Sequence, residues 1–148
     1  MDVMARIAEA VEAGHAGNTD DARRRLAELW EDAEVQADPL HRCTLAHHAA
    51  DLQTTVIDEL GWDLRALEAA DEVTAERARA QHPSLDVAAF YPSLHLNLGD
   101  AYLRLGDAAG ACHHLERARA CLDRLPDDGY GRMIRAGVEA LGQRCGDR

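Results

Sequence analysis

Apolar residues recur along much of the chain at the spacing of one face of an α-helix. The clearest case is the segment 93–118, in which two apolar stripes are separated by Gly106 and Asp107. The first stripe consists of Leu94, Leu98, Tyr102 and Leu105, and the second of Ala111, Leu115, Ala118 and Leu122. Steps of three and four residues are typical of helices. Glycine can end a helix in a left-handed conformation and aspartate can cap the next helix, so we predict a helical hairpin that turns at Gly106.

Weaker versions of the same pattern predict helices on both sides of this hairpin. One helix is expected over 20–35, and another begins at Pro39 behind the capping residue Asp38. A long helix over 84–105 is expected to bend at Pro92, because proline disrupts the interior of a helix. The sequence therefore predicts an all-α single domain over 1–148. Its parts are antiparallel helical hairpins at 2–35, 39–71 and 84–124 and a C-terminal capping helix at 129–144.

The hairpin at 93–118 resembles a tetratricopeptide repeat (TPR). The resemblance rests on a large residue, an L-G-x-x-Y segment, a Gly-Asp turn and small residues in the second helix. These positions are His95, Leu98, Gly99, Tyr102, Gly106, Asp107, Ala111, Leu115 and Ala118. His95 departs from the family, where tryptophan is usual. The glycine at position 99 is costly inside a helix, which predicts that a neighbouring helix approaches closely there. The resemblance, to a bacterial TPR-like family, implies an α-solenoid of about three hairpins.

Composition and charge narrow the class of partner. The formal net charge is −11, which opposes binding to nucleic acid and to anionic membranes. All 16 basic residues are arginine, which we attribute to codon usage in a GC-rich genome. The four cysteines form no C-x-x-C motif, and neither a signal peptide nor a membrane-spanning run is visible. We therefore expect reduced cysteines and a cytoplasmic protein.

Candidate site residues come from the first helices of the second and third hairpins. In the TPR family these helices line a concave groove, and the resemblance assigns to it Cys43, His47, Asp51, Asn97, Asp100 and Arg104. Independently of the family, the i, i+4, i+8 spacing of Cys43, His47 and Asp51 places them on one helix face. A hydrogen bond donated by the His47 ring to the Asp51 carboxylate would orient the imidazole and raise the pKa of His47. Asp100 and Arg104 form an i, i+4 ion pair.

Three functional interpretations follow from these residues. The first is a non-enzymatic interaction scaffold that binds a peptide or partner protein in the groove. The second is a divalent transition metal held by Cys43, His47 and Asp51, whose thiolate, imidazole and carboxylate are competent ligands. The third is an enzyme in which His47 acts as a general base beside Asp51, with Cys43 as nucleophile. Self-association of the chain into a homo-oligomer is a further possibility.

The remaining histidines and both tryptophans have simpler structural interpretations. His95 is expected in the core with one nitrogen hydrogen-bonded, because it occupies a core position of the repeat. The adjacent His113 and His114 are expected to face solvent. Trp30 and Trp62 are expected in the core rather than at a ligand site.

Overall fold

The computed structural model describes residues 1–146, and these residues are almost entirely helical. They form nine α-helices and two short 3-10 helices, with no β-strand among the residues described. The all-α prediction is therefore confirmed. Within the same residues, no helix combines the length and the apolar character that crossing a bilayer demands.

The chain divides into two compact units. The N-terminal unit is Met1–Val73 and the C-terminal unit is Thr74–Arg148. Each unit contains its own packed helices and its own apolar cluster. The single domain expected over 1–148 stays a prediction, and each unit is described below by itself.

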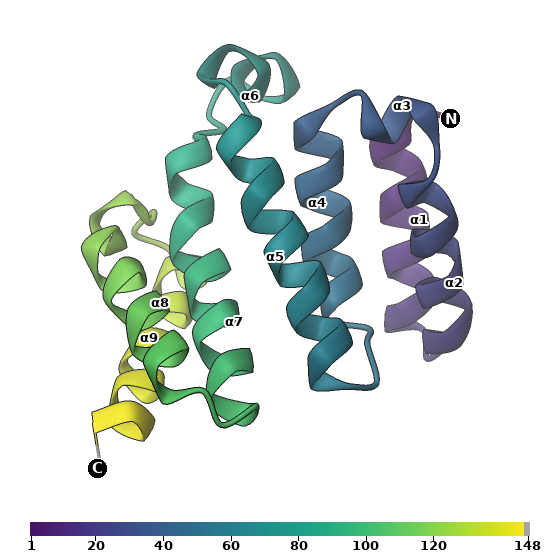
Figure 1. Cartoon of the computed structure of the whole chain (residues 1–148). Coiled ribbons are helices and arrows are strands. Elements are labelled where there is room, and N and C mark those ends of the chain that lie inside the picture. Colours follow the sequence, from purple (N-terminus) through teal and green to yellow (C-terminus); the bar gives the residue numbers. More distant parts are fainter. Residues whose placement is uncertain (147–148) are drawn as a thin grey trace. The chain divides into compact units, whose positions relative to one another are not determined.

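The N-terminal unit consists of two helix pairs and a short connecting helix. Its elements are α1 (Val3–His15), α2 (Thr19–Trp30), α3 (Ala33–Gln36), α4 (Pro39–Ala50) and α5 (Val56–Glu72). The most extensive contacts join α4 to α5 and α1 to α2, and Figure 1 shows each pair running side by side. Residues far apart in sequence share its core, which includes Ile7, Leu26, Val35 and Leu45.

The N-terminal end of α4 follows the sequence prediction, and α5 begins with a comparable cap. The Asp38 carboxylate accepts the Leu40 N–H at 3.0 Å, and Pro39 occupies the first turn of α4. Proline is tolerated there because its missing N–H would have no partner inside the helix. Thr55 caps α5 in the same way, by accepting the Asp58 N–H at 3.2 Å.

One predicted helix is interrupted. The helix expected over 20–35 ends at Trp30, and α3 begins at Ala33. Between them, the Asp32 carboxylate accepts the Glu34 N–H at 2.8 Å and so starts a new helix. The prediction of one continuous helix was wrong because the apolar pattern does not mark the break: Val35 is fully buried in the short helix that follows it.

The C-terminal unit is built around the predicted hairpin. Its elements are α6 (Ala75–Gln81), the 3-10 helix η1 (Val87–Phe90), α7 (Tyr91–Arg104), α8 (Ala108–Ala120), the 3-10 helix η2 (Leu122–Arg124) and α9 (Gly129–Gly146). The α7–α8 pair has the most extensive contacts of the unit. At the turn, Gly106 has a φ of 84°, and Asp107 accepts the Gly110 N–H at 2.9 Å. Both predicted roles at this turn are confirmed.

The helix before the turn starts later than predicted. Instead of one bent helix over 84–105, α7 begins at Tyr91 and is preceded by η1. Asp86 caps η1 by accepting the Ala88 N–H at 3.0 Å, and Pro92 lies in the first turn of α7. Proline therefore starts this helix rather than kinking it.

The close approach predicted at Gly99 is present, and the neighbour is α9. A Cβ at Gly99 would lie 2.7 Å from Leu141 Cδ2, well inside van der Waals contact. The converse holds on α9, where a Cβ added at Gly137 would lie 2.8 Å from Cδ2 of Leu96 on α7. Two glycines, one on each helix, thus allow α7 and α9 to pack closely.

Candidate functional site

The predicted site residues of the N-terminal unit lie at the end of α4 but differ in exposure. Cys43 is only 4% exposed and belongs to the core. His47 is half-buried, whereas Asp51 is exposed and forms the C-cap of α4. The three residues therefore run from the interior to the surface rather than facing one shared space.

Burial makes Cys43 a poor nucleophile and a poor metal ligand. Loss of solvation raises the pKa of its thiol to about 12, so the sulfur carries its proton at neutral pH. The thiolate is the form that attacks carbonyls and binds metals. Within residues 1–146, no three histidine, cysteine or acidic side chains are arranged to hold a metal ion.

His47 differs from the prediction in the direction of its pKa. Burial lowers the pKa of His47 below its usual value, and the opposing effect of Asp51 is smaller. The buried Nδ1 atom has no hydrogen-bond partner, so Asp51 does not orient the ring through that nitrogen. The expectation of a raised pKa was wrong because desolvation of the imidazolium outweighs the attraction of an exposed carboxylate.

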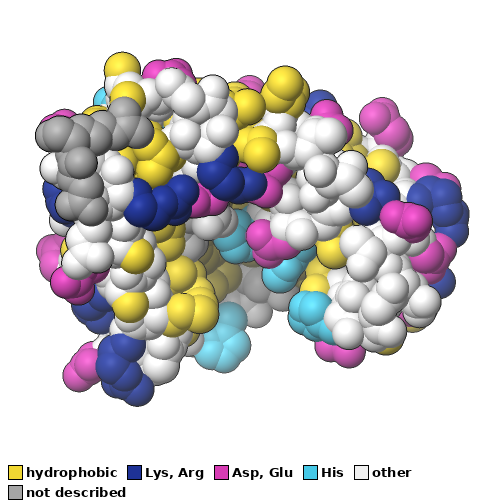
Figure 2. All heavy atoms as spheres, turned by 90° about the horizontal axis from the view of Figure 1, so that it is seen from below, with side chains coloured by type: hydrophobic (Ala, Val, Ile, Leu, Met, Phe, Trp, Pro, Cys, Tyr) yellow, Lys and Arg dark blue, Asp and Glu magenta, His cyan; other side chains and the backbone are white. Residues whose placement is uncertain are grey.

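A small cavity lies beside these residues. Its volume is about 170 Å³, and it is lined by Val11, Gly14, His15, His48, Asp51 and Leu52. Burial lowers the pKa of His48, and the neighbouring His47 and His15 lower it further. Figure 2 colours the side chains by type, and histidines are among those exposed on the face seen from below. The cavity is smaller than the roughly 300 Å³ at which ligand pockets usually begin, so it does not define a substrate site.

In the C-terminal unit, the predicted residues form an ion-pair cluster on α7. Asp100 accepts from Arg104 at 2.9 Å, as the spacing predicted. It also accepts from Arg144 of α9 at 2.6 Å, a partner that the sequence did not indicate. Asn97 lies one turn earlier on α7 and is half-buried. Asp100 thus holds two guanidinium groups at the surface of α7 and α9.

The most unusual polar contact of the chain is buried in the same unit. His95 Nδ1 and His114 Nδ1 lie 3.0 Å apart, and the two residues are 4% and 9% exposed. Their ring centres are 5.2 Å apart and their planes differ by 23°. Since the centres are 2.2 Å farther apart than the nitrogens, the rings meet edge to edge in a hydrogen bond rather than face to face.

Tyrosine rings flank the histidine pair on both sides. Tyr91 lies 6.1 Å from His95, with ring planes 24° apart, and Tyr102 lies 5.4 Å from His114, with planes 3° apart. His95 occupies the core as predicted. The solvent-facing prediction holds for His113, which is exposed, but was wrong for His114. Position 114 lies three residues after Ala111 and four before Ala118, so it belongs to the apolar stripe despite its polar side chain.

Only one of the two facing Nδ1 atoms can carry a proton if they are to form a hydrogen bond. A neutral imidazole has one N–H, so one Nδ1 donates and the other accepts. If both Nδ1 atoms carried protons, two donors would face each other across 3.0 Å. Burial lowers the pKa of His114, with smaller contributions from His113 and Arg117. His114 therefore favours its neutral state, and its contact with His95 links α7 to α8.

Comparisons of the chain with protein-family models, with curated proteins and with solved structures find no match. Arguments about function therefore rest on the residues and geometry described above.

Proposed function

We propose that this chain is a non-enzymatic, TPR-like interaction module that binds a peptide or protein partner through the polar face of α7. The observation that carries the proposal is the packing of the α7–α8 hairpin. The small residues Ala111 and Ala118 are buried at the helix contacts, and Gly106 lies at the turn. This is the arrangement that the TPR resemblance implies, and such repeats commonly bind partners through their first helices.

The packing supports the proposal position by position. Leu98, Ala111 and Ala118 are fully buried, and Leu115 is 4% exposed. Gly106 takes the left-handed conformation at the turn, and Gly99 accepts a neighbouring helix. The residues that carry the resemblance thus have packing roles, which leaves the side chains between them for contact with a partner.

Asn97, Asp100 and Arg104 are the binding residues that we propose. Asp100 lies three residues after Asn97, and Arg104 lies four residues after Asp100, so the three side chains share one face of the helix. Asp100 fixes Arg104 and Arg144 in place before a partner arrives, which reduces the ordering cost of binding. Such a surface suits a peptide that presents both hydrogen-bonding and charged groups.

Catalysis or metal binding through Cys43 has less support. Its thiol is buried and protonated, and His47 lacks a partner at Nδ1. A general base needs a hydrogen-bond path to its substrate, and a nucleophile needs exposure. We therefore favour the interaction module over the metal-binding or enzymatic alternatives.

The proposal is tested by selecting a random peptide library on the immobilised protein. The affinity of the enriched peptides is then measured by calorimetry on the wild type and on an Asn97→Ala, Arg104→Ala double variant. We expect a loss of about tenfold or more, the equivalent of about 1.4 kcal/mol. Glu116→Ala, an exposed position of α8, is the matched control and should bind normally. Equal affinity of the double variant and the wild type would contradict the proposal.

A further inference from the structure

The net negative charge of the chain comes from its N-terminal unit. Residues 1–73 contain 17 aspartates and glutamates against 6 arginines, a formal charge of −11, which equals that of the whole chain. Residues 74–148 contain 10 acidic residues and 10 arginines, so they are formally neutral. A basic partner would therefore be attracted to the N-terminal unit in particular.

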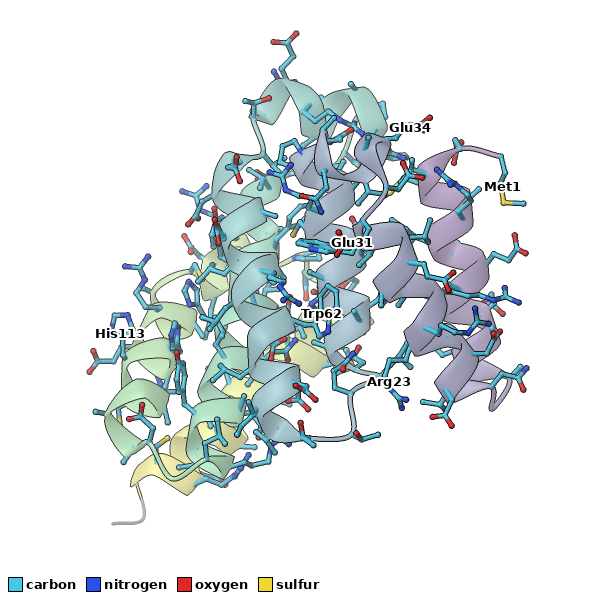
Figure 3. The ribbon with its side chains drawn as sticks, turned by 45° about the vertical axis from the view of Figure 1, so that its right-hand side comes forward. Met1, Arg23, Glu31, Glu34, Trp62 and His113 are labelled. Carbon is cyan, nitrogen blue, oxygen red and sulfur yellow. The ribbon has the colours of Figure 1, made fainter. Side chains whose placement is uncertain are left out.

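Two tryptophans form an aromatic corner on this acidic unit. Trp30 at the end of α2 and Trp62 on α5 have ring centres 5.3 Å apart and planes at 87°. Both are half-buried, so part of each ring remains accessible. Figure 3 shows Trp62 and the acidic residue Glu31, which follows Trp30, on the same side of the unit. Two perpendicular indoles offer a cation two aromatic surfaces at once.

The corner already holds a cation from the chain itself. The Arg65 guanidinium carbon lies 4.4 Å from the Trp62 ring centre and 5.7 Å from that of Trp30. Arg65 is exposed, and within residues 1–146 it forms no salt bridge. An exposed cation–π contact is weak enough to be displaced by a competing cation.

A small cavity next to the corner contributes a carboxylate. It measures about 140 Å³ and is lined by Trp30, Gln36, Arg42, Arg65, Glu68, Ala69 and Glu72. Glu72 is neutralised by Arg42 at 2.8 Å, whereas Glu68 has no salt-bridge partner among the residues that the structure describes. The cavity is too small for a cofactor but comparable to the end of one side chain.

We propose that the Trp30–Trp62 corner and Glu68 bind an arginine side chain of a basic partner peptide, and that Arg65 occupies this site until the partner displaces it. Arginine is favoured over lysine because its planar guanidinium stacks on an indole while its N–H groups reach a carboxylate. Lysine offers only a compact, strongly hydrated charge. This surface lies in a different unit from the α7 face of the proposed function and is argued from different residues.

The intrinsic fluorescence of the protein reports directly on this site, because Trp30 and Trp62 are the only two tryptophans in the chain. The probes are a short peptide of alternating glycine and arginine and its glycine-lysine counterpart. At moderate ionic strength, the arginine peptide is expected to change the fluorescence and to bind about tenfold more tightly than the lysine peptide. Equal affinities for the two peptides would overturn the proposal and leave only attraction by net charge.

Three variants distinguish binding at the Trp30–Trp62 corner from general attraction by net charge. Arg65→Ala removes the internal competitor and should tighten binding of the arginine peptide several-fold, whereas Glu68→Gln should weaken it. Arg24→Ala removes one positive charge from an exposed position of α2 and is the matched control for Arg65→Ala. If Arg24→Ala and Arg65→Ala tighten binding equally, the corner plays no part. If the Asn97→Ala, Arg104→Ala double variant binds its peptides as tightly as the wild type, the proposed function fails but the test of the Trp30–Trp62 corner still stands.

Discussion

His95 Nδ1 and His114 Nδ1 lie 3.0 Å apart in the core of the C-terminal unit and join α7 to α8 across the Gly106 turn. The remaining core of this unit is largely aliphatic, so the pair is its most demanding polar contact. A buried hydrogen bond of this kind is costly to break, because each partner left alone keeps its desolvation penalty. The stability of the hairpin should therefore depend on this pair and on pH.

We predict that lowering the pH below about 6.5 destabilises the protein. Burial lowers the pKa of His47, His48 and His114 below the usual histidine value of about 6.5. Between that value and the lower folded pKa, the unfolded chain binds protons that the folded chain does not. Stability is then lost as the pH falls, by at most about 1.4 kcal/mol per pH unit for each histidine. Urea unfolding between pH 8 and pH 5 measures this slope, and a flat profile would contradict the assigned burial.

The contribution of the histidine pair is isolated by His114→Ala. This change removes the hydrogen bond between the two Nδ1 atoms and the ring that lies beside Tyr102. We expect a loss of about 2 to 4 kcal/mol, from the lost hydrogen bond and from the cavity together. His113→Ala, at the neighbouring exposed position, should cost less than about 0.5 kcal/mol. Similar losses for the two variants, measured by urea unfolding, would show that His114 is not buried as described.

Three glycines of similar helical context should respond differently to replacement by alanine. At Gly131 a Cβ would lie 1.9 Å from the Pro126 carbonyl oxygen, so Gly131→Ala must move the backbone and should cost about 3 kcal/mol or more. At Gly99 the obstacle is the tip of Leu141, and the expected cost is about 1 to 2 kcal/mol. Gly61 has no atom within 4 Å, and Gly61→Ala should stabilise by about 1 kcal/mol. Thermal unfolding of the three variants ranks them, and a different order would contradict the close contacts described at Gly131 and Gly99.

The helices that the sequence predicts well are those with explicit end signals. Asp38 and Pro39 start α4 as predicted, and Gly106 and Asp107 form the turn as predicted. The break at Asp32 was missed because a short helix follows it without disturbing the burial of Val35. Periodicity records which residues are buried, and it does not record whether the chain stays helical between them.

The candidate site was less predictable than the fold. The Asp100–Arg104 pair follows from local spacing, whereas Arg144 reaches Asp100 from a helix 44 residues away in sequence. His114 was expected at the surface together with its neighbour His113, although position 114 lies on the apolar stripe. The contact between Trp30 and Arg65 was not predicted either, because these residues meet only through the packing of α2 on the second hairpin. Tertiary contacts of this kind leave no local pattern in a single sequence.

Cysteine reactivity provides a test of the assignment of Cys43. The thiol is 4% exposed, and burial raises its pKa to about 12, so it should not react with a thiol reagent in the folded protein at pH 8. Cys112 is exposed and should be labelled first. Labelling followed by peptide mass spectrometry distinguishes the two positions. Rapid modification of Cys43 in the folded state would reopen the nucleophile and metal interpretations.

The proposed partner-binding face is tested most directly by nuclear magnetic resonance of the 16.2 kDa chain. Backbone amide and arginine side-chain N–H shifts are recorded while a peptide selected from the random library is added. We predict that the largest shift changes fall on α7 at Asn97, Asp100 and Arg104 and on the side chain of Arg144. Changes confined to the outer face of α8, or the absence of any saturable change, would contradict the claim that α7 presents the binding surface of a TPR-like module.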